Sequence, residues 1–155
     1  MPFFSRKSTR LPGYDYATGN YYFITICTHE KKCLFGSAGK SKFGKLAEEC
    51  LLQIPEHFSN VMLDKWVIMP NHIHAIIVLR SNVTDQQLPA LSTIVGQYKA
   101  AVTKKSHVIA PELQIWQRSF HDHIIRGQQD YAKIWEYIEN NPKKWEEDCF
   151  YIEYK

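Results

Sequence analysis

The run His72-Ile73-His74-Ala75-Ile76-Ile77-Val78-Leu79 decides the fold of this chain. Its aliphatic and β-branched residues predict a strand, and both alternating sets of side chains are largely apolar. A strand that is apolar on both faces belongs in the middle of a sheet, covered on either side. The same alternation places His72 and His74 on one face, together with Ile76 and Val78.

Strand and helix patterns alternate on both sides of this run. The tight pair Pro70-Asn71 predicts a hairpin with the preceding strand, and the expected strands besides 72–79 are 21–28, 61–69 and 115–126. The expected helices are 43–54, which stops near Pro55, then 91–102, and 128–140 before Pro142. This order predicts an α+β fold of the ferredoxin-like kind. We expect a mostly antiparallel sheet of about four to five strands, packed with helices and followed by a C-terminal helix.

Length and composition indicate one folded domain over 1–155. The chain has 155 residues, 45% hydrophobic and 14% aromatic, which excludes a disordered protein. No apolar signal region and no run of about 18 apolar residues is present, so we expect neither secretion nor membrane insertion but a cytoplasmic location. The cysteines lack the paired spacing of a metal or redox motif: Cys27, Cys33, Cys50 and Cys149.

Positive charge is modest in total but clustered. The net charge of +3 does not by itself require a nucleic-acid partner. Residues 1–19 are basic, polar and rich in turn residues, which predicts an N-terminal arm. The candidate phosphate-binding side chains are Arg6, Lys7, Arg10, Lys99, Lys104, Lys105 and Arg118. Clusters of this kind also occur on ordinary solvated surfaces, so the pattern alone leaves both interpretations open.

Two imidazoles on one face of a rigid strand form half of a site for a divalent cation. Farther along the chain, Tyr137 and Asn141 lie four residues apart, which places both on one face of the last expected helix. Helical periodicity puts Tyr137 about 120° from the centre of the apolar stripe formed by Tyr131, Ile134, Trp135 and Ile138. A histidine pair with a displayed helical tyrosine favours a metal-assisted nuclease that uses the tyrosine as nucleophile.

Each of these residues could instead have a purely structural role. A bare His-x-His arises more often by chance than as a metal site, and an asparagine before a proline is a common helix end. A second pair, His121 and His123, is a rival on ligand chemistry alone. Asp122 between them would have to face the other side of the sheet, whereas Ile73 can anchor its strand in the core. We therefore favour the first pair.

The chain resembles the single-tyrosine transposases of the IS200/IS605 family, which belong to the HUH endonucleases. More narrowly it is similar to the REP-associated tyrosine transposases. The resemblance is carried by motifs that follow one another along nearly the whole chain: RLPGYDY (10–16), YFITICT (22–28), MPNHIH (69–74), IVGQYK (94–99), WQRSFHDHIIR (116–126) and YIENNP (137–142).

This resemblance implies that His72 and His74 bind Mg²⁺ or Mn²⁺ and that Tyr137 is the nucleophile. The residue four positions later is a third ligand. It is typically glutamine in insertion-sequence relatives and Asn141 here, although the neighbouring Asn140 leaves that assignment open. The implied substrate is single-stranded DNA beside a hairpin, cleaved and rejoined through a 5′-phosphotyrosine. Relatives include monomers and dimers whose tyrosine helix serves the partner's site, so a homodimer and a monomer both remain open.

Two other classes of protein fit the same sequence. A four-stranded α+β sheet also serves nucleic-acid-binding domains without catalysis. A metal-dependent nuclease could use water instead of the tyrosine. The first would not need the histidines and Tyr137 to converge, and the second would tolerate loss of the Tyr137 hydroxyl.

Overall fold

The computed structural model describes residues 20–80 and 89–147, without the side chains of 146 and 147. The expected arm at 1–19, with Arg6, Lys7 and Arg10, lies outside the described residues, as does Cys149. The strands are β1 (Asn20–Cys27), β2 (Val61–Met69), β3 (His72–Leu79) and β4 (His121–Ile124). The α-helices are α1 (Lys42–Leu52), α2 (Ile54–His57), α3 (Leu91–Ile109) and α4 (Gln128–Asn140), and the 3₁₀ segments are η2 (His29–Lys31), η3 (Ser37–Gly39) and η4 (Pro142–Glu147).

The four described strands form one sheet in the order β2-β3-β1-β4. Every neighbouring pair is antiparallel, so the expected ferredoxin-like α+β fold is confirmed. The hairpin is also confirmed, because Met69 pairs with His72 across the Pro70-Asn71 turn. Strand β3 is buried at every position and has a partner on each side, as its two apolar faces predict.

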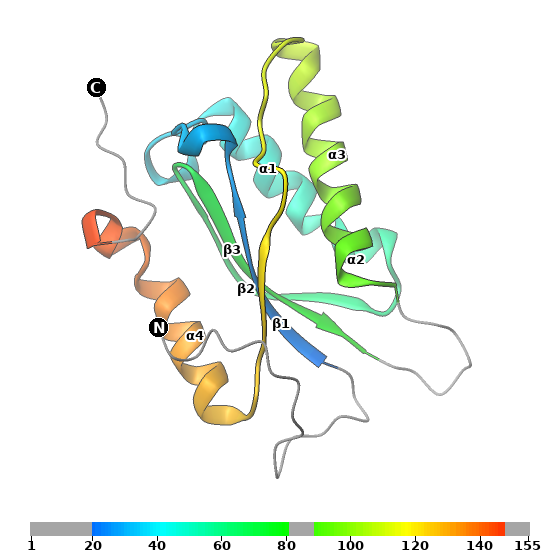
Figure 1. Ribbon diagram of the computed structural model, residues 1–155, viewed down its shortest axis with the longest axis vertical. Coiled ribbons are helices and arrows are strands. Elements are labelled where there is room, and N and C mark those ends of the chain that lie inside the picture. The colour runs from blue at the N-terminus through cyan, green and yellow to red at the C-terminus, as the bar shows by residue number, and fades with distance from the viewer. Residues whose placement is uncertain (1–19, 81–88, 148–155) are drawn as a thin grey trace.

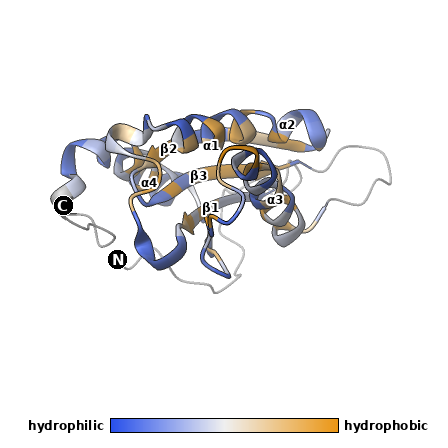
Figure 2. Ribbon diagram, turned by 90° about the horizontal axis from the view of Figure 1, so that it is seen from above, coloured by the Kyte–Doolittle hydropathy of each residue, from blue (hydrophilic) through white to orange (hydrophobic). Residues whose placement is uncertain are grey.

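The sheet separates two layers of helices. Helices α1 and α3 pack against one face, and α4 packs against the other (Figure 1). On the first face the buried cluster includes Ile73, Ala75, Ile77 and Leu79, together with apolar residues of α1 and α3. On the second face Phe23, Ile76 and Val78 pack with Ile125 and with Ile134 and Ile138 of α4. Figure 2 shows the hydrophobic colour prominent on β3, between these layers.

Three expected boundaries are wrong. The expected strand at 115–126 is only four residues long, at His121–Ile124, preceded by an isolated bridge between Trp116 and Thr28. The physical reason is competition for backbone carbonyls, because Lys99 Nζ donates to the carbonyl of Gln117 at 2.7 Å and that of Ser119 at 3.4 Å. A side chain that donates to backbone carbonyls competes with strand pairing for them.

The helix expected over 91–102 continues to Ile109, so Lys104 and Lys105 lie within α3. Pro55 does not stop the preceding helix either. Helix α1 ends at Leu52, and Pro55 lies in the first turn of α2, where its missing N–H would have had no partner. Among the described helices, none has the length and apolar character needed to cross a membrane.

Candidate metal and tyrosine site

The histidine pair lies at the start of the central strand β3. His72 and His74 are 0% and 1% exposed, and their ring centroids are 4.5 Å apart. Across the sheet, His72 lies between Cys27 of β1 and Met69 of β2. Because β3 is held from both sides, the separation of the two imidazoles is set by the sheet, as the alternation along the strand predicts.

The tautomer of the neutral His72 ring follows from its neighbour Asn71. Asn71 Oδ1 lies 2.8 Å from His72 Nδ1, while Asn71 Nδ2 donates to the carbonyl of Lys31 at 3.2 Å. The second bond identifies which end of the amide is nitrogen, so the oxygen faces the ring. An amide oxygen only accepts, so Nδ1 of His72 carries the proton and donates. Nε2 then holds the lone pair through which this ring would bind a cation.

His74 is oriented in a similar way from β1. Thr25 Oγ1 lies 2.9 Å from His74 Nδ1 and can accept a hydrogen bond from it. The ring of Phe23 lies 5.2 Å from that of His74 and packs against its face at 32°. The Nε2 atoms of His72 and His74 are both buried. Each ring therefore has its Nδ1 engaged by a neutral side chain, the arrangement that commonly orients metal-binding histidines.

Tyr137 reaches the histidines of its own chain. Its ring centroid lies 5.2 Å from that of His74 and 6.2 Å from that of Phe23. The expected position of Tyr137 away from the apolar face of the helix is therefore wrong. Tyr137 is half-buried and packs beside Ile134 and Ile138 against the sheet. A second copy of the chain is not needed to bring the tyrosine to the pair.

Trp135, which periodicity assigns to the apolar stripe, is instead 38% exposed. Lys65 of β2 lies over its ring at 4.1 Å and forms an ion pair with Glu139 at 2.6 Å. The apolar indole suggests a core position. Here it packs against the stem and ammonium of Lys65 at the edge of the contact between α4 and the sheet. The sheet-facing stripe runs through Ile134 and Ile138 to Asn141.

Asn141 is the described residue best placed to be a third ligand. It is 3% exposed, and its Oδ1 is buried with no hydrogen-bond partner in the described part of the chain. It lies four residues after Tyr137, whose ring contacts His74, and four before Trp145, whose ring lies 6.1 Å from that of His72. Asn141 is therefore bracketed by two contacts to the histidine pair.

The chemistry of this set fits a divalent cation. The described residues contain no group of three His, Cys, Asp or Glu side chains that could hold a metal ion, so a third ligand to the histidine pair would come from another residue type. A buried carbonyl oxygen without a hydrogen bond is costly unless something binds it. Two imidazole nitrogens and an amide oxygen are donors that Mg²⁺ or Mn²⁺ can use.

Tyr131, the other tyrosine of α4, has a different environment. Its hydroxyl donates to Asp64 Oδ2 at 2.6 Å, and burial together with this carboxylate raises the pKa of Tyr131. A phenol that donates to a carboxylate and resists deprotonation is a poor nucleophile. Tyr131 ties α4 to β2 and is not part of the histidine site.

The rival pair is not assembled as a site. His121 is exposed, whereas His123 is buried with its Nε2 2.9 Å from Asp130 Oδ2. The same oxygen of Asp130 accepts from the backbone N–H of Arg126 at 2.8 Å. This cluster joins β4 to the first turn of α4, and β1 separates it from β3.

The lysine candidates within the described residues lie on the opposite face of the sheet from the histidines. Lys99, Lys104 and Lys105 are on α3, which covers the other face of the sheet. Burial lowers the pKa of Lys99, and Lys105 Nζ lies 3.1 Å from Glu49 Oε1. Arg118 is exposed in the segment before β4. The structure does not bring the three lysines to the face that carries Tyr137.

Sequence reasoning missed four side chains that lie beside the pair: Phe23, Thr25, Asn71 and Trp145. The turn pattern explains the presence of Asn71, and the strand pattern explains that of Thr25. Neither pattern reveals that the side chain forms a hydrogen bond with an imidazole. A usable signal existed only for Asn71, since a buried polar residue next to a histidine is a frequent partner of its ring.

Comparisons with known proteins identify the family of the chain. Residues 16–141 match the family model of IS200-like transposases. The chain is 37% identical to an uncharacterized protein of Haemophilus influenzae, covering 96% of this chain and 94% of that protein. It is 26% identical to a provisionally named REP-associated tyrosine transposase of the same organism, covering 84% and 74%.

Two solved structures share the fold. One is a REP-associated tyrosine transposase bound to a REP hairpin, with a TM-score of 0.61, 22% identity, and coverage of 89% of this chain and 73% of that chain. The other is a protein described as a transposase of Deinococcus radiodurans, with a TM-score of 0.55, 20% identity, and coverage of 86% and 96%. Fold and site together define a class of protein in which a ferredoxin-like sheet carries two histidines beneath a helical tyrosine. The chain belongs to the IS200-like transposase family.

Proposed function

We propose that this transposase cleaves and rejoins single-stranded DNA beside a hairpin, using Tyr137 as the nucleophile. A divalent cation, Mg²⁺ or Mn²⁺, would be held by His72, His74 and Asn141. The observation that carries the proposal is the contact between Tyr137 and His74, with ring centroids 5.2 Å apart in one chain. A tyrosine with only a packing role would not need two oriented imidazoles beside it.

The bound cation would polarise the scissile phosphate and neutralise the charge that develops on it. The Tyr137 oxygen attacks phosphorus, so a bond forms between that oxygen and phosphorus while the bond to the 3′ oxygen breaks. The phenol loses its proton, and the departing 3′ oxygen gains one. The products are a 5′-phosphotyrosine and a free 3′-hydroxyl. One phosphoester replaces another, so a 3′-hydroxyl can reverse the step without an added energy source.

The residues around the pair have supporting roles in this mechanism. Asn71 and Thr25 keep the Nδ1 side of each ring engaged, which directs Nε2 toward the cation. Phe23 packs against both His74 and Tyr137, so it sets the tyrosine ring against the histidine. A hairpin substrate is supported by the related transposase of the same fold, which was solved bound to a REP hairpin.

The test is incubation with a single-stranded oligonucleotide that carries a hairpin, with Mg²⁺ or Mn²⁺, followed by a denaturing gel. We expect a covalent protein–DNA species, with the 5′ end of the DNA on Tyr137 by mass spectrometry. Tyr137→Phe keeps the ring and should bind DNA but form no adduct. Tyr131→Phe is the matched control and should retain the adduct, because that hydroxyl is bound to Asp64.

The same assay separates the alternatives. A binding module without catalysis would give no cleavage, and a hydrolase that uses water would cut DNA even as Tyr137→Phe. His72→Ala and His74→Ala should abolish the adduct and Mn²⁺ binding. His123→Ala should leave Mn²⁺ binding intact, since that ring is paired with Asp130. Loss of Mn²⁺ binding in His121→Ala and His123→Ala instead would show that the other pair holds the metal.

A further inference from the structure

A cleft of about 160 Å³ opens beside the histidine pair, and the mechanism above gives it no role. It is lined by residues of three segments: Ser37, Ala38, Met69, Pro70, Pro142 and Trp145. Met69 pairs with His72 across the hairpin. The Trp145 ring lies 6.1 Å from that of His72, stacked at 27°. The cleft is therefore next to the candidate cation site, on the side of His72.

The wall of this cleft at 35–39 is held by the backbone. Phe35 N–H donates to the carbonyl of Pro70 at 3.0 Å, which ties the wall to the hairpin turn. Ala38 has a φ of 54°, a left-handed conformation that residues with a side chain seldom adopt. Gly39 has a φ of 66°, and a Cβ there would lie 2.5 Å from the carbonyl of Ile68. The wall is thus closely fitted to the end of β2.

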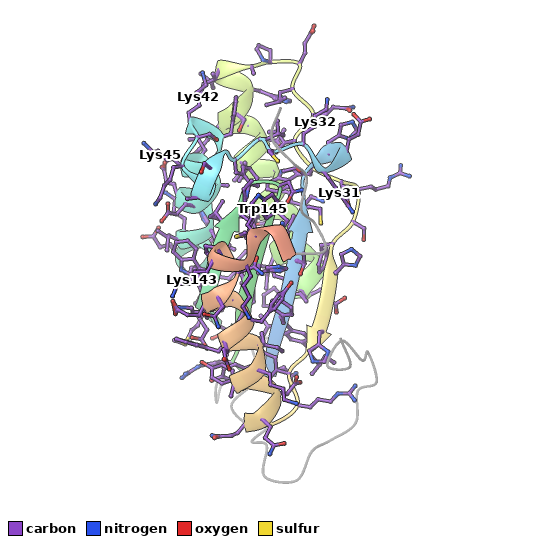
Figure 3. The ribbon with its side chains drawn as sticks, turned by 90° about the vertical axis from the view of Figure 1, so that its left-hand side faces the viewer. Lys31, Lys32, Lys42, Lys45, Lys143 and Trp145 are labelled. Carbon is purple, nitrogen blue, oxygen red and sulfur yellow. The ribbon has the colours of Figure 1, made fainter. Side chains whose placement is uncertain are left out.

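The lining and the surroundings of the cleft differ in character. Side chains of methionine, two prolines and tryptophan make most of the lining apolar. In Figure 3, lysines lie on the face that displays Trp145, with Lys42, Lys45 and Lys143 to one side of it and Lys31 and Lys32 to the other. Lys42, Lys45 and Lys143 are exposed. An apolar slot with an aromatic wall and cations around it is the combination that binds single-stranded nucleic acid.

The size of the cleft limits its occupant. A cavity of roughly 150 Å³ accommodates one benzene ring, so a cleft of about 160 Å³ matches the size of one planar ring. A peptide would offer no negative charge to the lysines unless it were acidic, whereas each nucleotide supplies both a flat ring and a phosphate.

We propose that this cleft receives one nucleobase of the single strand, the base of a nucleotide that flanks the scissile phosphate, stacked on Trp145. The lysines around it contact the neighbouring phosphates. This inference rests on the proposed function. In this arrangement the base anchors the strand so that its phosphate lies at the histidine pair, and the side chains of the cleft help to select the position of cleavage.

The test measures DNA binding by the Tyr137→Phe protein, which cannot form an adduct. A hairpin oligonucleotide is made with one abasic nucleotide at each position of its single-stranded arm in turn. We expect one position at which removal of the base weakens binding by about 5- to 150-fold, the range for losing one base–aromatic stack. That position should adjoin the bond that the wild-type protein cleaves.

A substitution in the cleft identifies where that base binds. Ser37→Leu fills the cleft from the wall at 35–39, and the doubly substituted protein should bind the intact and the abasic oligonucleotide equally. Ser59→Leu places the same side chain at an exposed position beyond the other end of β2 and should keep the full difference. Trp145→Phe retains an aromatic wall and should keep most of the difference in binding between the intact and the abasic oligonucleotide. Thermal unfolding and Mn²⁺ affinity of each variant show whether fold and metal site are intact.

The inference would be overturned if every abasic position weakened binding evenly, or if the sensitive position persisted in Ser37→Leu. A sensitive position far from the cleaved bond would also contradict it. Failure of the proposed function looks different. In that case the wild-type protein forms no adduct, while the sensitive position and its dependence on Ser37 are still observed.

Discussion

Two uncharged side chains, Asn71 and Thr25, control how the histidines are presented. Asn71 is fully buried and accepts from His72 Nδ1, and Thr25 contacts His74 Nδ1. Without the Asn71 oxygen, the proton of His72 could move to Nε2 and block that nitrogen as a ligand. At the scale of single residues, the proposed metal affinity would therefore depend on more than the residues that touch the metal.

We expect Asn71→Ala to weaken Mn²⁺ binding by about 10- to 100-fold, the usual effect of losing the partner of a metal-binding histidine. Isothermal titration calorimetry measures this directly. Asn60→Ala changes the same residue type at the other end of the hairpin and should leave the affinity unchanged. Equal affinities for Asn71→Ala and the wild type would contradict the assigned role of the amide.

Asn141→Ala makes a second prediction at this scale. Its Oδ1 is buried without a hydrogen bond in the described residues, so its removal should not lower the melting temperature of the metal-free protein. Addition of Mn²⁺ should raise the melting temperature of the wild type and have little effect on the variant, because a ligand that binds only the folded state stabilises it. Asn140→Ala is the control, since Asn140 is only half-buried, and it should keep the shift. The reverse result would assign the ligand to Asn140.

Helix α4 is the element that brings the tyrosine to the sheet. It is attached at several points along its length: by His123 and Asp130 at its start, by Tyr131 and Asp64 after that, and by Lys65 with Trp135 and Glu139 near its end. The exposed ion pair of Lys65 and Glu139 contributes little by itself. Burial of Ile134 and Ile138 supplies most of the attachment.

We therefore expect Ile134→Ala to lower the free energy of unfolding by about 2–5 kcal/mol, as for other large-to-small changes in a core. It should also reduce adduct formation, because a loosened α4 no longer holds Tyr137 against His74. Urea unfolding monitored by circular dichroism gives the first quantity. Lys133→Ala, one position earlier and exposed, should change stability by no more than about 0.5 kcal/mol. Similar stabilities of both variants would mean that α4 is not packed as described.

At the scale of the whole molecule, two buried or hydrogen-bonded phenols predict how stability depends on pH. Burial raises the pKa of Tyr98, whose hydroxyl donates to the carbonyl of Ala47 at 2.8 Å. Burial and Asp64 raise the pKa of Tyr131. Below about pH 10 both phenols are neutral in the folded and unfolded chain. Above it only the unfolded chain ionises readily, so stability is lost as pH rises.

The measurement is the free energy of unfolding in urea between about pH 9 and 11. We expect the wild type to lose stability across this interval, and Tyr131→Phe to lose less, because it has one fewer phenol whose pKa differs between the two states. A wild-type protein whose stability rises over the same interval would reverse the sign that the structure predicts.

Several features were determined by the sequence alone, because they depend on local periodicity. The alternation over His72–Leu79 placed this strand in the centre of the sheet and both histidines on one face, and the order of strand and helix patterns specified a ferredoxin-like α+β fold. These conclusions hold because a strand or helix period assigns side chains to faces without reference to distant residues.

Only the tertiary structure decided what those faces meet. Tyr137 lies against His74 because its side of α4 packs on the sheet. Trp135 lies on the outer side of the helix, where Lys65 of β2 contacts its indole. In the segment before β4, a backbone carbonyl accepts a hydrogen bond from Lys99, a residue distant in the sequence, and this bond competes with strand pairing. Periodicity carries no information about such partners, because contacts between distant residues are formed by folding and are absent from any local pattern. The side chains next to the histidine pair are likewise known only from the tertiary structure.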